Sequence, residues 1–207
     1  MIKAVIFDFG RVISAQKPMS LFRGYETELG LAYGTLNRVM FGSDAWREVL
    51  VGRKTVEAYW SEIAPKLGLN SPEEMVEFRE RYHADEAINA GVLELIRCLH
   101  GRYRLAVLSN SPAGLNRWLA EWGILDLFDT VVCSGDVGLA KPDPAIFRLA
   151  LGRLGVTPQE AIFIDDSPRH VEAAAVVGLH AIHFTTAEAL ERQLACALET
   201  EEARGTG

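Results

Sequence analysis

Short, uninterrupted apolar runs recur along the chain, and each ends at a polar residue. They span residues 4–7, 105–108, 130–133 and 161–164 and are rich in β-branched side chains. Such runs are typical of strands that are buried on both faces, as in parallel sheets. After residue 87 they alternate with helical patterns, which favours right-handed strand–helix–strand crossovers. The sequence therefore predicts an α/β fold, with a parallel sheet covered by helices on both faces.

The segment between the first two runs has a helical pattern instead. Apolar residues at positions 56, 59, 60, 63 and 67 recur at three- and four-residue spacing, which gives a helix one apolar face. Ser71 and Glu74 form a capping box with Pro72 between them, so a further helix begins there. We therefore expect an all-helical insertion over residues 15–86, after the first strand, and a core domain over residues 1–14 and 87–207.

Carboxylates follow the first and last of these runs. Asp8 follows residues 4–7, and Asp165 and Asp166 follow residues 161–164. Ligands of parallel sheets bind beyond the carboxyl ends of the strands. Carboxylates that meet there repel one another unless a cation lies between them. The pattern therefore predicts a divalent metal site, in which one carboxylate could act as a nucleophile.

The two middle runs bring groups suited to an anion. Ser109 and Asn110 follow the run at 105–108, and Lys141 lies in the loop after 130–133. A hydroxyl and an amide can hydrogen-bond phosphate oxygens, and a lysine can neutralise their charge. A capping residue precedes proline at 111–112, 143–144 and 167–168, so we expect three helix N-termini at the same edge. The predicted ligand is a phosphate.

These residues, in this order, resemble the haloacid dehalogenase superfamily, whose members are mostly phosphatases that work through an aspartyl-phosphate. The resemblance covers residues 1–184 and implies a Rossmann-like core, a mobile helical cap over 15–86 and a Mg²⁺ cofactor. It implies that Asp8 is the nucleophile, that Ser109 contacts the phosphate, that Lys141 neutralises charge, and that Asp165–Asp166 hold the metal. The motifs Asp-Phe-Gly-Arg-Val-Ile, Leu-Ser-Asn and Phe-Ile-Asp-Asp are most similar to bacterial sugar-phosphate phosphatases of the glucose-1-phosphate phosphatase type. The phosphatase domain of soluble epoxide hydrolase is a more distant comparison.

The sequence departs from this family at Gly10, where most members have the aspartate that serves as general acid and base. The backbone carbonyl of Gly10 can still bind the metal, because that contact needs no side chain. The glucose-1-phosphate phosphatase type, which the sequence resembles, also has glycine at this position. Arg11, in the same loop, is a further candidate for substrate binding. His170 stands where relatives often have Asn or Asp, and its role is left open.

Composition restricts the partners. The net charge is −7 and no basic stripe appears, which argues against nucleic-acid and membrane-surface binding. No signal peptide or membrane-length apolar segment is present, so we expect a cytoplasmic protein. Cys98, Cys133 and Cys196 lie in apolar segments and are predicted to be reduced core thiols. The sequence does not indicate the oligomeric state.

The function predicted on these grounds is Mg²⁺-dependent hydrolysis of a small phosphorylated metabolite, such as a sugar phosphate, through an aspartyl-phosphate on Asp8. Two alternatives remain open. A metal-independent 2-haloacid dehalogenase would use the same aspartate on carbon, although it would not need the Asp165–Asp166 pair. A non-catalytic binding module would explain Gly10 but not the otherwise complete site.

Overall fold

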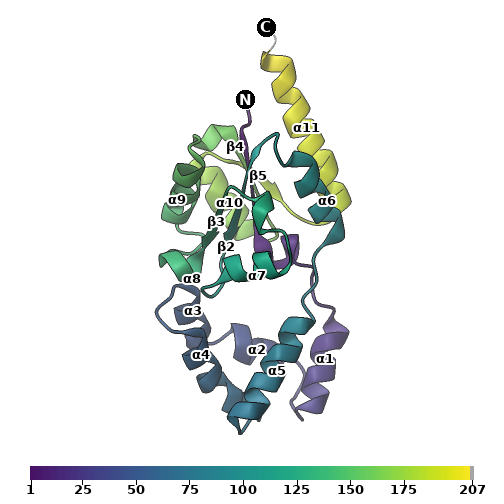
Figure 1. Cartoon of the computed structure of the whole chain (residues 1–207), viewed down its shortest axis with the longest axis vertical. Helices are drawn as coiled ribbons and strands as arrows, with labels where there is room; N and C mark the ends of the chain where they lie inside the picture. The colour runs from purple at the N-terminus through teal and green to yellow at the C-terminus, as the bar shows by residue number, and fades with distance from the viewer. Residues whose placement is uncertain (206–207) are drawn as a thin grey trace.

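The chain folds around one parallel sheet, with a helical lobe beyond one edge of it (Figure 1). The computed structural model describes the backbone of residues 1–205 and the side chains of residues 1–198. The strand order is β3-β2-β1-β4-β5, and every neighbouring pair is parallel. The strands are β1 (Ala4–Phe7), β2 (Arg104–Ser109), β3 (Thr130–Cys133), β4 (Ala161–Asp165) and β5 (His180–His183). The α/β class predicted from the apolar runs is confirmed.

Alternate residues of the central strand β1 point to opposite faces, and each face has its own apolar cluster. Val5 and Phe7 pack with α6 (Ala90–Leu99), α7 (Leu115–Glu121) and α11 (Ala187–Gly205). Ala4 and Ile6 pack with α9 (Pro144–Leu154) and α10 (Pro168–Val177). Because both faces are covered, the strands are apolar throughout rather than alternating. The shorter elements here are α8 (Ser134–Val137), η3 (Leu125–Leu127) and η4 (Pro158–Glu160).

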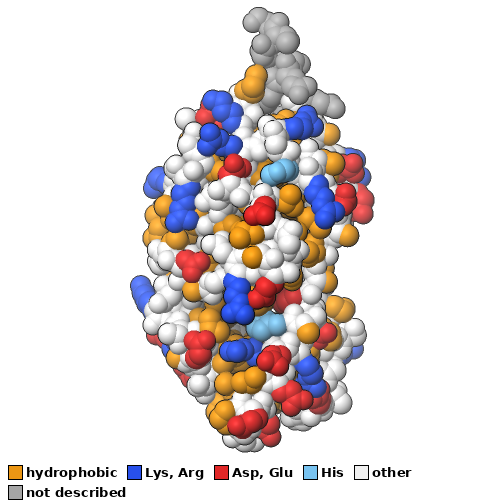
Figure 2. Space-filling view, viewed as in Figure 1, with side chains coloured by type: hydrophobic (Ala, Val, Ile, Leu, Met, Phe, Trp, Pro, Cys, Tyr) orange, Lys and Arg blue, Asp and Glu red, His pale blue; other side chains and the backbone are white. Residues whose placement is uncertain are grey.

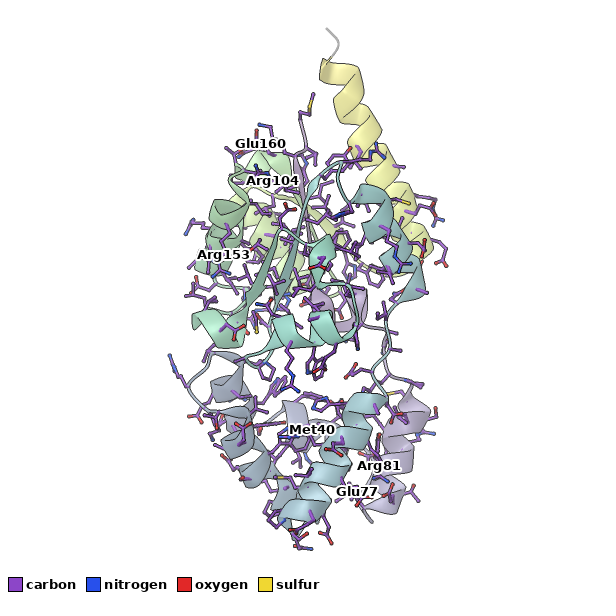
Figure 3. The ribbon with its side chains drawn as sticks, in the orientation of Figure 1. Met40, Glu77, Arg81, Arg104, Arg153 and Glu160 are labelled. Carbon is purple, nitrogen blue, oxygen red and sulfur yellow. The ribbon has the colours of Figure 1, made fainter. Side chains whose placement is uncertain are left out.

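Two arginines on the core, both labelled in Figure 3, fasten α9 to the sheet. Arg104 of β2 donates from Nη1 to the carbonyl oxygen of Leu154 at 2.8 Å. Arg153 of α9 donates from Nη1 to the carbonyl oxygen of Val131 in β3 at 3.0 Å. The first bond satisfies a carbonyl at the end of α9, and the second satisfies a carbonyl of the edge strand β3. Together they fix α9, the helix that follows the Lys141 loop.

The helices between Met19 and Ala84 form the helical lobe, which has an apolar cluster of its own. Its elements are α1 (Met19–Glu28), α2 (Thr35–Phe41), α3 (Asp44–Leu50), α4 (Val56–Ile63), η2 (Ala64–Leu67) and α5 (Pro72–Ala84). Ser71 caps α5 as expected, accepting a hydrogen bond from the backbone N–H of Glu74 at 3.1 Å. The separate cluster supports the predicted division into a core and a cap. The boundaries of the two domains, at residues 14–15 and 86–87, stay a prediction.

The two segments that join the lobes run side by side. The backbone N–H of Ala15 donates to the carbonyl oxygen of Ala87 at 2.7 Å, and that of Asn89 donates to Ile13 at 2.8 Å. The lobes also touch at Gly52, where a Cβ atom would lie 2.5 Å from the carbonyl oxygen of Gly135. Glycine is needed at this close approach, and the cap lies against the carboxyl edge of the sheet (Figure 1).

Two expectations about local structure are wrong. No helix begins at Ser111–Pro112, because the backbone N–H of Ser111 donates to Ser134 Oγ and its carbonyl accepts from Gly135 N–H. The helix α7 begins at Leu115 instead, after Gly114. Of the three cysteines only Cys133 is buried, whereas Cys98 and Cys196 lie on exposed helix faces.

The surface carries charges of both signs. On the face shown in Figure 2, Lys and Arg side chains are interspersed with Asp and Glu side chains over both lobes. Within the described residues, no helix has both the length and the apolar character needed to cross a bilayer.

Candidate active site

The three predicted acids meet at the carboxyl ends of two neighbouring strands. Asp8 directly follows β1, Asp165 is the last residue of β4, and Asp166 comes next. Because β1 and β4 are paired in register, an oxygen from each carboxylate lies within 4.8 Å of the others. The sequence pattern therefore brings together three negative charges that need a positive partner.

Lys141 supplies one such charge from the loop between α8 and α9. Its Nζ atom lies 2.7 Å from Asp8 Oδ1 and 2.6 Å from Asp165 Oδ2, and its side chain is fully buried. Burial raises the pKa of Asp8 to about 6, against the opposing effect of Lys141. Burial also acts to raise the pKa of Asp165, but the hydrogen bond from His170 and the charge of Lys141 together hold it below its usual range. The buried lysine thus links the acid after β1 to the acid that ends β4.

Asn110 fixes the backbone that carries this lysine. Its Oδ1 accepts from the N–H of Lys141 and its Nδ2 donates to the carbonyl of the same residue, both at 2.8 Å. Asp143, two residues further on, caps α9 by accepting from the N–H of Ala145 at 2.8 Å. The side chain of Asn110 is therefore engaged with protein, and a contact from Asn110 to substrate would have to come from its backbone.

Asp165 differs from its two neighbours because both of its oxygens are occupied. Oδ1 accepts from the N–H of Ser167 at 2.8 Å, and both oxygens lie 3.1 Å from Nδ1 of His170. No described residue donates to Oδ2 of Asp8 or to Oδ1 of Asp166. Likewise, the hydroxyl of Ser109, at the end of β2, makes no hydrogen bond with any described residue. The site thus offers open oxygen groups beside a fixed Lys141–Asp165 pair.

These open groups are suited to a hard cation. Mg²⁺ prefers oxygen ligands, and among the described residues the potential ligand cluster consists of three carboxylates. Two aspartates with an unshared oxygen each, plus a backbone carbonyl, match the few protein ligands that Mg²⁺ usually takes. By donor chemistry the residues fit the predicted metal.

The turn after Asp8 holds Gly10, which departs from the family pattern, and Arg11, the further candidate for substrate binding. Gly10 has ordinary extended dihedrals, φ −65° and ψ 124°, and a Cβ atom added there would meet nothing within 4 Å. Arg11 has φ 60°, and its Nε lies 3.0 Å from Oδ2 of Asp166. Burial raises the pKa of Asp166, while Arg11 acts to lower it. Arg11 thus reaches one of the three clustered acids in this structure.

Two histidines support the acids at the end of β4, and sequence reasoning did not assign them. His170 lies in the first turn of α10 and donates from Nδ1 to Asp165, five residues earlier. His183, at the end of β5, donates from Nε2 to the backbone carbonyl of Asp166 at 3.0 Å. The spacing from Asp165 to the first helical turn could have indicated the first contact. The second depends on the pairing of β4 with β5, which the sequence did not predict.

The cap approaches this region through a row of rings. Phe9, next to the Asp8 position, packs against Trp118 of α7 with ring centroids 6.3 Å apart. Trp118 also contacts the ring of His83 in α5, with ring centroids 4.7 Å apart. Nδ1 of His83 is buried without a hydrogen-bond partner among the described residues, and burial lowers the pKa of this histidine to about 4. The helical lobe and the core therefore meet here through ring contacts.

Comparison with known proteins adds the family. A model described as "haloacid dehalogenase-like hydrolase" matches residues 2–178. The sesquiterpene phosphatase astK of Aspergillus oryzae is 28% identical, over 88% of this chain and 90% of its own. The fructose-1-phosphate phosphatase YqaB of Escherichia coli is 25% identical, over 86% and 94%. Some other curated relatives are longer, and the chain spans between 19% and 36% of their length.

Among solved structures, a haloacid dehalogenase family enzyme from Bacteroides thetaiotaomicron, in complex with magnesium and inorganic phosphate, has the same fold. The TM-score is 0.73, with 20% identity over 90% of this chain and 96% of that one. At this level of identity the similarity concerns the fold.

Proposed function

The chain belongs to the haloacid dehalogenase-like hydrolases, and we propose that within this family it is a Mg²⁺-dependent phosphomonoesterase acting on a small phosphorylated metabolite. One observation carries the proposal: a buried lysine bridges Asp8 and Asp165, while Asp8, Asp166 and Ser109 keep oxygen atoms that no described residue occupies. A dehalogenase acting on carbon would have no use for the second acidic group at Asp166.

Each residue receives a role in this proposal. Asp8 attacks phosphorus and the leaving-group oxygen departs with a proton taken from solvent; water then attacks the aspartyl-phosphate and releases inorganic phosphate. Lys141 and the Ser109 hydroxyl hold phosphate oxygens as charge shifts onto them. Asn110 keeps the Lys141 loop in place and can offer its backbone N–H. We also propose that Arg11 and the cap over residues 15–86 contact the substrate.

Mg²⁺ would be held by Asp8, Asp166 and the backbone carbonyl of Gly10, and when bound it would neutralise charge on the phosphate. Asp165 has its oxygens taken by Lys141, Ser167 and His170, so we assign it to positioning Lys141 rather than to direct metal contact. The proposal thus gives different roles to two adjacent acids, between which the sequence alone did not choose.

The test combines a metal titration with a matched pair of variants. An aryl phosphate should be hydrolysed with Mg²⁺ and not in excess chelator, and hydroxylamine should trap an acyl phosphate formed from the wild-type protein. Asp8→Asn should abolish turnover and trapping while the fold is kept, because an amide has nearly the same size but is a poor nucleophile. Asp143→Asn, at the start of α9, is a control outside the three acids. Turnover of a haloacid in excess chelator would favour the dehalogenase instead.

The substrate is proposed only as a class. The named relatives act on a sugar phosphate and on sesquiterpene phosphates, so both classes belong in a first screen of phosphorylated metabolites. Sugar phosphates phosphorylated at the anomeric carbon are placed first, since their leaving hydroxyl is more acidic than an ordinary alcohol and Gly10 supplies no acid.

A further inference from the structure

Arg11 is bound to one of the acids that the proposed metal would need. Its Nε lies 3.0 Å from Oδ2 of Asp166, with side-chain exposures of 61% for the arginine and 17% for the aspartate. Lys141 reaches the other two acids but makes no contact with Asp166 among the described residues. Arg11 is thus the cation in direct contact with Asp166 among the described residues.

The backbone at Arg11 is unusual for this side chain. Its φ of 60° lies in the left-handed region, and every other described residue with a positive φ is a glycine. A side chain with a Cβ disfavours this conformation, and such residues cluster where function requires them. The turn is held by the hydrogen bond from the N–H of Arg11 to Ser14 Oγ at 3.1 Å. A glycine would adopt this backbone conformation at no cost but would bring no charge. With arginine at the position, the guanidinium reaches Asp166.

We propose that Arg11 is a built-in counter-ion of the metal site, which pairs with Asp166 in the metal-free protein and is displaced when Mg²⁺ binds. The inference rests on the proposed metal site and goes beyond it, because it assigns to this arginine the setting of metal affinity. A cation that must be displaced weakens the apparent binding of its competitor. The pair is partly exposed, so the effect is moderate, and removing it should tighten Mg²⁺ binding about two- to fivefold.

The test measures Mg²⁺ binding directly, by titration calorimetry on the wild-type protein and on Arg11→Gln at matched ionic strength. Arg11→Gln keeps most of the side chain and removes its charge. Arg11→Lys keeps the charge and should bind Mg²⁺ close to the wild-type affinity. Arg169→Gln is the matched control, since Arg169 is an exposed arginine in the first turn of α10 and makes no hydrogen bond or ion pair with the three acids among the described residues. It should leave the dissociation constant unchanged.

Thermal unfolding gives an independent readout that does not involve activity. Without metal, Arg11→Gln should lower the midpoint, because Asp166 loses its partner beside two other carboxylates. Added Mg²⁺ should raise the midpoint of this variant by more than it raises that of the wild type.

The outcomes separate the inference from the function on which it rests. Tighter binding by Arg11→Gln, with Arg169→Gln unchanged, supports the counter-ion. Equal or weaker binding by Arg11→Gln overturns it while leaving the metal site intact. Equal tightening by both arginine variants would reduce the effect to overall charge and also overturn it. Absence of Mg²⁺ binding in every protein would overturn the metal site and the inference together.

Discussion

An aspartate at position 10 should give this site the acid that its sequence lacks. The structure has room for this side chain, because Gly10 has a negative φ and a Cβ there would meet nothing within 4 Å. Gly10→Asp therefore adds a carboxyl without backbone strain or a clash. The strained position in this turn is the next one, Arg11, which the substitution leaves alone.

The new carboxyl would join three acids that already lie within 4.8 Å of one another. A negative charge about 6 Å from another costs about 3 kcal/mol at an effective dielectric constant of about 20, before Lys141 offsets part of it. This repulsion raises the pKa of the introduced carboxyl, which helps it to carry a proton near neutral pH. General acid catalysis contributes about 10²–10⁴-fold, so a gain of about tenfold, or 1.4 kcal/mol of barrier, is a cautious expectation.

The assay compares two substrate classes in the same variant. With a primary alkyl phosphate, kcat should rise about tenfold or more in Gly10→Asp, because the alkoxide leaving group needs a proton. With an aryl phosphate, kcat should change little, since a phenolate leaves without one. Gly10→Asn is the matched control, having the same shape without an acidic proton, and should give no gain.

Two results would refute this reasoning. An equal change on both substrates would show that the substitution acts on binding or geometry and not on protonation of the leaving group. Equal rates on alkyl and aryl phosphates in the wild-type protein would show that another residue already supplies the proton.

Three further changes probe the site and its surroundings. Lys141→Met should abolish phosphatase activity and destabilise the protein by about 3–5 kcal/mol in urea unfolding, because Asp8 and Asp165 would remain buried without their partner; unchanged stability would contradict the buried bridge. Arg11→Gly should be about 1 kcal/mol more stable than Arg11→Ala, because only glycine tolerates the φ of 60°; equal stabilities would mean that the turn relaxes. Burial lowers the pKa of His83 from 6.5 to about 4, so the unfolded state binds more protons between these values and stability falls as pH drops through this window. At about pH 5.5 the loss of stability from His83 is at most about 1.4 kcal/mol, reduced by its partial exposure. The measurement is the free energy of unfolding at about pH 7.5 and at about pH 5.5, and the drop between the two should be smaller in His83→Phe by this amount.

The fold could be predicted where burial alone decides the structure. Four of the strands are apolar runs that any buried parallel strand would show, and Asp143 caps α9 by a local hydrogen bond. The strand β5 was not predicted individually, because its sequence His-Ala-Ile-His is short, has polar ends and lies at the sheet edge. Ser111 failed as a helix cap because its backbone groups bind a distant loop, and such a contact is invisible to a local pattern.

The candidate site shows the same division. The meeting of Asp8, Asp165 and Asp166 follows from parallel pairing and was predictable. The contact between Asn110 and the Lys141 backbone was not, because it joins two loops whose conformations the sequence does not specify. The left-handed backbone at Arg11 could not be predicted, because residues with a Cβ atom rarely adopt that conformation and glycine usually does.

The charges of the site give an order to its assembly. Three carboxylates exceed Lys141 and Arg11 by one negative charge, so the metal-free site repels an anion such as phosphate. A divalent cation would reverse that balance, and under the proposed displacement it would free the guanidinium that pairs with Asp166. The phosphate is therefore expected to bind after the metal, to a site whose net charge is positive and whose arginine no longer has a protein partner. On this proposal Gly10 and Arg11, neighbours in one turn, would act on different steps: Gly10 on protonation of the leaving group and Arg11 on entry of the metal.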